Sequence, residues 1–225
     1  MPNEFNDIRI FFTKTGMTKY ISHLDLMRCM SRAIRRAGIP LWYTEGYNPH
    51  LFMTFARPLS LGQESLCECV DVRLVGEMTL KEVQTRLNAA LPDGITIVRV
   101  AKPVHKSMEI AFAAYEITLY PERIDALETC ILEAYAKPQI TVLKKAKQGR
   151  RKIEKEIDIK PNIVEFQCKK EEDKLCIHMR LTAGIDNNIN PSLLLSALTK
   201  GYGDEFIPTS ILKTKLFIEN GEIFS

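Results

Sequence analysis

The sequence lacks any apolar run of the roughly 18 to 20 residues that a membrane-spanning helix needs. Its start, M-P-N-E-F-N-D, is polar and acidic, unlike a secretory signal peptide. A strong excess of one charge is also missing, because 31 Lys and Arg against 28 Asp and Glu give a net charge of +3. We therefore expect a cytoplasmic protein with no membrane partner. Any case for nucleic-acid binding must rest on where the charges lie.

Cysteine is sparse, with six in 225 residues, and only Cys67 and Cys69 lie close together, as C-x-C. No C-x-x-C pair is present to begin a zinc or iron–sulfur site, so we expect reduced structural thiols, no metal and no cofactor. A P-loop, a dinucleotide-binding fingerprint and the spacing of a nucleophilic triad are missing as well. Composition and motifs thus assign no reaction.

What the sequence does hold is a helix with two contrasting faces. Ser22 with Asp25 three residues later predicts its start, and Gly38 and Pro40 predict its end. At about 100° per residue one arc is apolar and contains Leu26, Met27, Cys29, Met30, Ala33, Ile34 and Ala37. The opposite arc is an arginine stripe, formed by Arg28, Arg32, Arg35 and Arg36.

An aromatic loop follows this helix, with a glycine hinge at Gly46. Its members are Trp42, Tyr43, Tyr47, Asn48, Pro49 and His50. Guanidinium groups beside exposed rings suit single-stranded or looped RNA, in which phosphates meet Arg and bases stack on aromatic rings. The alternative is an ordinary solvated helix face, although such a face more often mixes acids among its bases.

The order of predicted elements is β-α-β-β-α-β, and it occurs twice. Strands are predicted at 7–14, 51–57, 67–74, 95–100, 115–120, 163–168, 175–181 and 211–219, and further helices at 79–91, 121–135 and 190–198. This order predicts an α+β protein of two ferredoxin-like halves packed side by side around a ligand cleft. The predicted domains are 1–101 and 112–225, joined by a linker at 102–111.

The second half carries an additional segment, 139–161, which we expect to be a protruding hairpin or arm. It is basic, and Lys145, Lys147, Arg150, Arg151 and Lys152 lie around Gly149 at its tip. Such a tip suits contact with a phosphate backbone, since it would displace the counterions of the backbone. The alternative is a mobile, lysine-rich loop whose charges only keep it soluble.

Candidate catalytic residues lie at the start of the first helix. A neutral His23 could act as a general base toward a ribose 2′-hydroxyl, with Tyr20 and Asp25 close in sequence. The helical wheel, however, places His23 on the core side, where a structural histidine bonded to a strand carbonyl is the alternative.

Five runs carry a family resemblance: S-H-L-D-L-M-R, R-A-I-R-R-A-G-I-P, E-G-Y-N-P-H, A-R-P-L-S-L-G-Q-E-S and E-C-V-D-V. The chain resembles the bacterial radical SAM-linked proteins, whose function is uncharacterised, over most of 7–220. The resemblance implies a domain that occurs alone or fused behind a radical SAM and cobalamin-binding enzyme. It also implies importance for Ser22, His23, Leu24, Asp25, Arg36, Gly46, Asn48, Pro49, Gly62 and Glu68. No C-x-x-x-C-x-x-C run is present, so it implies no radical chemistry in this chain.

The two-unit organisation is also similar to the CRISPR repeat-processing endoribonucleases, although fold alone does not confer function. Three hypotheses follow. The first is an RNA-binding accessory protein that acts in the processing or modification of tRNA or rRNA. The second is a protein that presents substrate to a radical SAM enzyme through protein contacts. The third is a metal-independent endoribonuclease.

Overall fold

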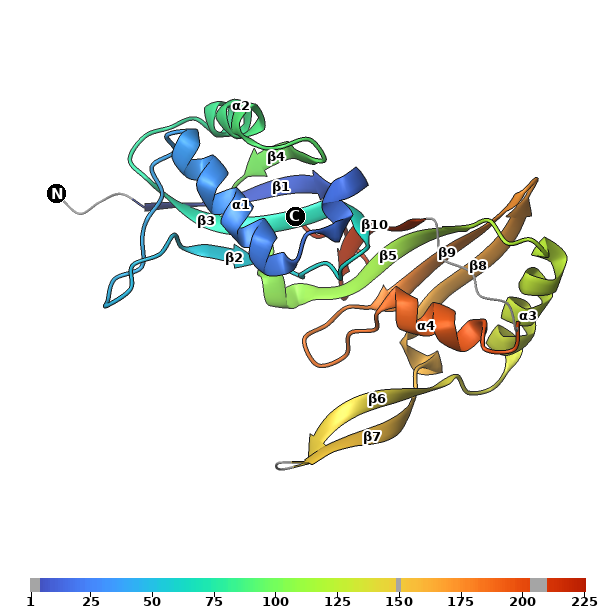
Figure 1. The fold of residues 1–225 in the computed structure, drawn as a ribbon. Helices are drawn as coiled ribbons and strands as arrows, with labels where there is room; N and C mark the ends of the chain where they lie inside the picture. Colours follow the sequence, from blue (N-terminus) through green and yellow to red (C-terminus); the bar gives the residue numbers. More distant parts are fainter. Residues whose placement is uncertain (1–4, 149–150, 203–209) are drawn as a thin grey trace. The chain divides into compact units, whose positions relative to one another are not determined.

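The computed structural model describes residues 5–148, 151–202 and 210–225. These residues form two compact units, one made of residues 5–110 with 220–225 and the other of the described residues between 111 and 219 (Figure 1). Both units combine helices with antiparallel strands, which confirms the predicted α+β class.

The first unit follows the predicted order of elements. These are β1 (Phe5–Lys14), α1 (His23–Arg36), β2 (Met53–Phe55), β3 (Glu64–Val75), α2 (Leu80–Ala90) and β4 (Ile95–Ala101). Its strands lie in the order β4-β1-β3-β2, and every neighbouring pair is antiparallel. The predicted strand at 51–57 is only three residues long as β2, because Pro58 has no N–H to extend pairing and the preceding chain forms a loop.

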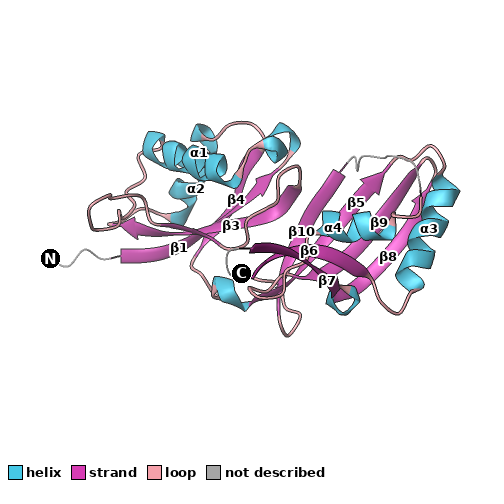
Figure 2. Ribbon diagram, turned by 60° about the horizontal axis from the view of Figure 1, so that its bottom comes forward, coloured by secondary structure: helices cyan, strands magenta, loops and turns pink. Residues whose placement is uncertain are grey.

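Alternation along β1 and β3 builds the core of this unit. Ile8, Ile10 and Phe12 are buried, and Val72 and Val70, which pair with Ile8 and Ile10, are buried in the same core. The apolar sides of α1 and α2 cover this face of the sheet (Figure 2). Their buried residues are Leu26, Met30, Ala33, Ile34, Val83 and Leu87. Because the apolar side of α1 is buried, its opposite side faces outward.

A short 3₁₀-helix, Gly16–Tyr20, connects β1 to α1 and packs against the turn before β4. The amide of Thr15 donates to the carbonyl of Gly94 at 2.8 Å. Gly94 has φ +87°, and a Cβ there would lie 2.6 Å from the Thr15 carbonyl oxygen. Both the backbone angle and the close approach therefore require glycine.

The last six residues lie on the other face of the first sheet. There Arg9, which is fully buried, donates to both carboxylate oxygens of Asp71 at 2.6 and 2.9 Å and to the carbonyl of Ser225 at 3.0 Å. Phe224 covers the guanidinium at 4.3 Å from its ring centre. The predicted second domain, 112–225, is therefore too long by residues 220–225, which these contacts hold in the first unit.

The second unit repeats the strand order of the first. Its elements are β5 (Ile110–Leu119), α3 (Ile124–Ala136), β6 (Thr141–Gln148), β7 (Arg151–Asp158), β8 (Ile163–Glu171), β9 (Lys174–Thr182), α4 (Pro191–Leu198) and β10 (Ser210–Ile218). The four sheet strands lie in the order β10-β5-β9-β8. The additional segment forms a separate antiparallel hairpin, β6–β7, as the sequence predicted. Part of the expected linker at 102–111 is structured, since it contains the 3₁₀-helix Ser107–Glu109 and the start of β5.

Candidate nucleic-acid interface

The start of α1 is fixed by the predicted cap. The Ser22 hydroxyl accepts from the Asp25 amide at 3.1 Å and donates to the Asp25 carboxylate at 2.7 Å. This hydroxyl bond, together with Arg28, holds the pKa of the Asp25 carboxyl below its usual value. Capping at Ser22 fixes the residue at which the helix begins.

The arginine stripe is exposed along its whole length, as predicted from the helical wheel. Its ends have partners of their own: Arg28 pairs with Asp25 at 3.2 Å, and Arg36 donates to the Ala90 carbonyl at 2.7 Å. In the middle, the Arg35 guanidinium lies over the Tyr43 ring at 5.9 Å. Arg32 has no hydrogen bond or ion pair within the part of the chain that the structure describes. The two central arginines are therefore the most available to an anionic ligand.

The aromatic loop leaves the edge of β3 and returns to it. The amide of Trp42 donates to the Arg73 carbonyl at 2.8 Å, and Tyr43 and Leu51 pair as an isolated bridge. At the tip, the His50 ring nitrogen Nδ1 lies 3.0 Å from the Thr44 hydroxyl and 3.2 Å from the Asn48 carbonyl. These short bonds hold the loop in one shape.

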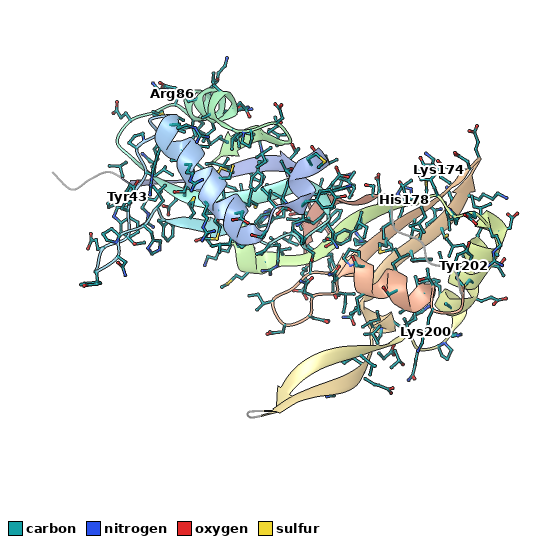
Figure 3. All side chains as sticks on the ribbon, in the orientation of Figure 1. Tyr43, Arg86, Lys174, His178, Lys200 and Tyr202 are labelled. Carbon is teal, nitrogen blue, oxygen red and sulfur yellow. The ribbon has the colours of Figure 1, made fainter. Side chains whose placement is uncertain are left out.

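The loop presents its rings unequally. Tyr47 is 100% exposed and Tyr43 is 40% exposed, whereas Trp42 is half-buried. The Trp42 ring packs against Phe5 and Phe52 at 6.1 and 5.6 Å, with the Arg73 guanidinium at 5.3 Å. Trp42 therefore belongs to a packed aromatic cluster, which corrects its placement among the exposed rings of the loop. Figure 3 labels Tyr43 at the base of the loop.

The sequence did not predict one cation near the arginine stripe, Arg86. Arg86 of α2 donates to the Ala37 carbonyl, at the end of α1, at 3.5 Å and to Glu82 at 2.6 Å (Figure 3). It stands 50 residues after Arg36 in the sequence, so only the packing of α2 on α1 brings it there. The signal available beforehand was its place on the outer face of the predicted helix at 79–91.

The three candidate catalytic residues occupy different surroundings. The His23 ring is partly exposed and packs edge-on against Phe55 at 5.1 Å. Tyr20 is 59% exposed beneath the Lys19 ammonium, and Asp25 is held by the cap. Among the described residues no hydrogen bond joins His23 to Tyr20, to Asp25 or to a strand carbonyl. The geometry thus assembles no acid–base group around His23.

The basic tip of the β6–β7 hairpin falls outside the part described at side-chain level. This applies to Lys145, Lys147, Arg150, Arg151 and Lys152. Within the described residues, no group of three His, Cys, Asp or Glu side chains could hold a metal ion. Over the same residues, no helix combines the length and the apolar character needed to cross a membrane.

Comparison with known proteins gives a family. The model of a family described as "Uncharacterized protein conserved in bacteria (DUF2344)" matches residues 7–191. The chain belongs to this family. No curated protein matches the sequence.

Two solved structures are similar in part. A chain of "Crystal Structure of a Cbf5-Nop10-Gar1 Complex" is 8% identical with a TM-score of 0.48, covering 93% of this chain. This protein spans about half, 48%, of that chain's length. "Crystal Structure of an Unknown Protein from Galdieria sulphuraria" is 12% identical with a TM-score of 0.27, covering 91% of this chain and 98% of its own. At such identities and TM-scores neither similarity indicates a function.

Proposed function

We propose that this protein binds RNA as an accessory factor in tRNA or rRNA processing or modification, through the arginine stripe and the aromatic loop. The observation that carries the proposal is the contact of Arg35 with Tyr43 beside the exposed Arg32 and Tyr47. Guanidinium groups neutralise phosphates, and exposed rings stack on unpaired bases. The short bonds of His50 support this, because a loop held in one shape loses less entropy on binding.

Salt dependence of RNA binding tests the stripe. Arg32→Gln with Arg35→Gln removes two phosphate contacts, and each contact to a single strand contributes about 0.7 to the slope of log affinity against log salt. We expect the slope to fall by about 1.4, measured by fluorescence anisotropy with a labelled RNA hairpin. The control is Lys81→Gln with Lys102→Gln, which removes the same charge from exposed positions outside the stripe. Equal slopes in the two double variants would reject the interface.

The loop has its own test. Tyr47→Ala should weaken binding to RNA with an unpaired loop by roughly 5- to 160-fold, because base–ring stacking contributes about 1 to 3 kcal/mol. Tyr47→Phe keeps the ring and should bind like the wild type. A fully paired duplex should respond little to either change. Loss of affinity in both variants alike would point to the hydroxyl and against stacking.

A second candidate function is the presentation of substrate to a radical SAM enzyme by protein contacts. One observation favours it: apolar side chains are exposed around the start of α1, with Met17 at 79%, Leu61 at 66% and Leu24 at 55%. The amide of Gly62 donates to the Lys19 carbonyl at 2.8 Å and so brings two of these segments together. Co-purification from cells with and without ribonuclease separates the functions, since only a protein contact survives loss of the RNA.

We expect no metal-independent RNA cleavage. A general base needs a hydrogen-bonded partner or substrate within reach, whereas His23 packs on Phe55 and Asp25 is held by Ser22. Incubation of total RNA in excess chelator with wild type and His23→Ala measures this. Cleavage by wild type that is absent from the variant would restore the nuclease hypothesis.

A ferredoxin-like fold for both units is part of the proposal. The order of elements β-α-β-β-α-β in each unit and the strand order β4-β1-β3-β2, repeated as β10-β5-β9-β8, support it.

A further inference from the structure

Among the described residues of the second unit, no helix covers one face of its sheet. On β5, Ala113, Tyr115 and Ile117 are buried toward α3 and α4, which lie across the other face (Figure 1, Figure 2). Alternation then places Phe112, Ala114, Glu116 and Thr118 on the face without helices. The same face carries His178 and Arg180, since both are in register with these β5 residues.

A groove of about 460 Å³ lies on this face. Ala114 lines it and is opposite Arg180 in the pairing of β5 with β9. The side chain of Ala114 is a single methyl group and so takes up little of this space. The surrounding side chains on this face are Glu116, Glu165, Gln167, His178, Lys215 and Phe217. Small-molecule sites typically measure about 300 to 1,000 Å³, so one planar ring system would fit.

One of the carboxylates that line the groove is held by an arginine. The guanidinium of Arg180 donates to Glu165 at 2.5 Å, and it lies 5.4 Å from the centre of the Phe217 ring and 5.9 Å from that of Phe112. This bond fixes the position of the Glu165 carboxylate, and a charge-assisted hydrogen bond of this kind is stronger than one between neutral groups.

The residues in register with His178 supply hydrogen-bond acceptors. Glu116 and Gln167 both stand opposite His178, one on each side of it across the sheet. The His178 Nδ1 is 3.9 Å from the Glu116 carboxylate, and both side chains are about half exposed. Figure 3 labels His178 on this sheet. An exposed imidazole ring flanked by a carboxylate and an amide suits a flat ligand with hydrogen-bond donors along its edge.

We propose that this groove binds a guanine base. Guanine carries two adjacent N–H donor groups for the carboxylates of Glu116 or Glu165, next to a carbonyl acceptor for the side-chain amide of Gln167. Adenine places an unprotonated ring nitrogen where guanine has a donor, so it would meet a carboxylate with an acceptor. A bare phosphate is disfavoured by the two carboxylates. This site is separate from the arginine stripe and does not depend on it.

Titration of the whole chain followed by ¹H–¹⁵N NMR tests the site. The probes are GMP, AMP and inorganic phosphate, and then the oligonucleotides UUGUU and UUAUU. We expect shifts in β5, β8 and β9 with the guanine probes, and at least roughly tenfold weaker binding of the adenine ones, as one good two-bond base contact provides. Binding of GMP identifies a free nucleotide as ligand, and binding of UUGUU alone identifies an RNA base.

Matched variants give the control. Ala114→Leu fills the groove and should abolish the shifts, whereas Thr118→Leu changes the same face of the same strand outside the groove and should keep them. Glu116→Gln should weaken guanine binding at least tenfold without filling space. Arg32→Gln with Arg35→Gln should leave guanine binding unchanged. The experiment can therefore reject the groove without rejecting RNA binding by the arginine stripe, and the reverse. Equal binding of GMP and AMP, shifts with phosphate alone, or no shifts would overturn the proposal.

Discussion

Replacing Arg9 by Ala should destabilise the first unit by about 3 kcal/mol, the lower end of the cost of breaking a buried ion pair. The Arg9 side chain is 1% exposed and that of Asp71 is 25% exposed. Removing the guanidinium takes two donors from the largely buried Asp71, which keeps only a longer bond from the Ser107 hydroxyl at 3.4 Å, and it takes one donor from the Ser225 carbonyl. The ring of Phe224 loses the cation that it covers at 4.3 Å. The lower end applies because water reaches part of Asp71.

Urea unfolding followed by tryptophan fluorescence measures this loss. The chain has one tryptophan, Trp42, and it lies in the first unit, so its signal reports that unit alone. At a denaturant slope of about 1.5 kcal/mol per molar, a loss of 3 kcal/mol moves the midpoint by about 2 M. Phe224→Ala should lower the same transition, because residues 220–225 belong to this unit.

The control for Arg9 is an exposed ion pair. Arg86→Ala breaks a bond to Glu82 in which both side chains are more than 40% exposed, so it should cost at most about 0.5 kcal/mol. Asp71→Ala and the double variant with Arg9→Ala complete a cycle, and the double variant should cost clearly less than the sum of the two. A midpoint for Arg9→Ala that matches Arg86→Ala would refute the reasoning.

Three further predictions concern the cap, a turn and a thiol. Ser22→Ala should lower the free energy of unfolding by about 1 kcal/mol. It should also reduce the amount of stability that the protein loses on acidification, and urea unfolding at several pH values measures both effects. The sign follows from Asp25, whose lowered pKa gives stability above its unfolded value near 4 that is lost as pH falls. Gly94→Ala should cost more in thermal unfolding than Gly62→Ala, because both have positive φ but only the first has close neighbours. Burial raises the pKa of Cys168 to about 12, so the folded state favours the protonated thiol. The resulting contribution to stability is complete at pH values below the pKa that this thiol has in the unfolded chain. That stability should be lost as pH rises above about 9, and Cys168→Ser should reduce the fall of the urea midpoint between pH 8 and 10.

Local patterns in the sequence determined the elements and the outward face of α1. Ser22 caps the helix because its hydroxyl needs only the amide three residues away. The arginine stripe follows from the helical period once Leu26 and Met30 are buried. Thr79 and Asn190 cap α2 and α4 by the same local rule. Interactions between neighbours in sequence are readable in advance because their geometry is fixed by the helix itself.

Contacts between distant segments were decided only by the tertiary structure. The sequence predicts Trp42 to be part of an exposed loop, yet the hydrogen bond of its amide to Arg73 of β3 places its ring against Phe5 and the Arg73 guanidinium. Residues 220–225 read as the end of the second half, yet the buried Arg9 holds them in the first. The groove at Ala114 depends on which residues of β8, β9 and β10 stand beside it. Strand register and long-range ion pairs depend on the whole packed sheet, which no local pattern specifies.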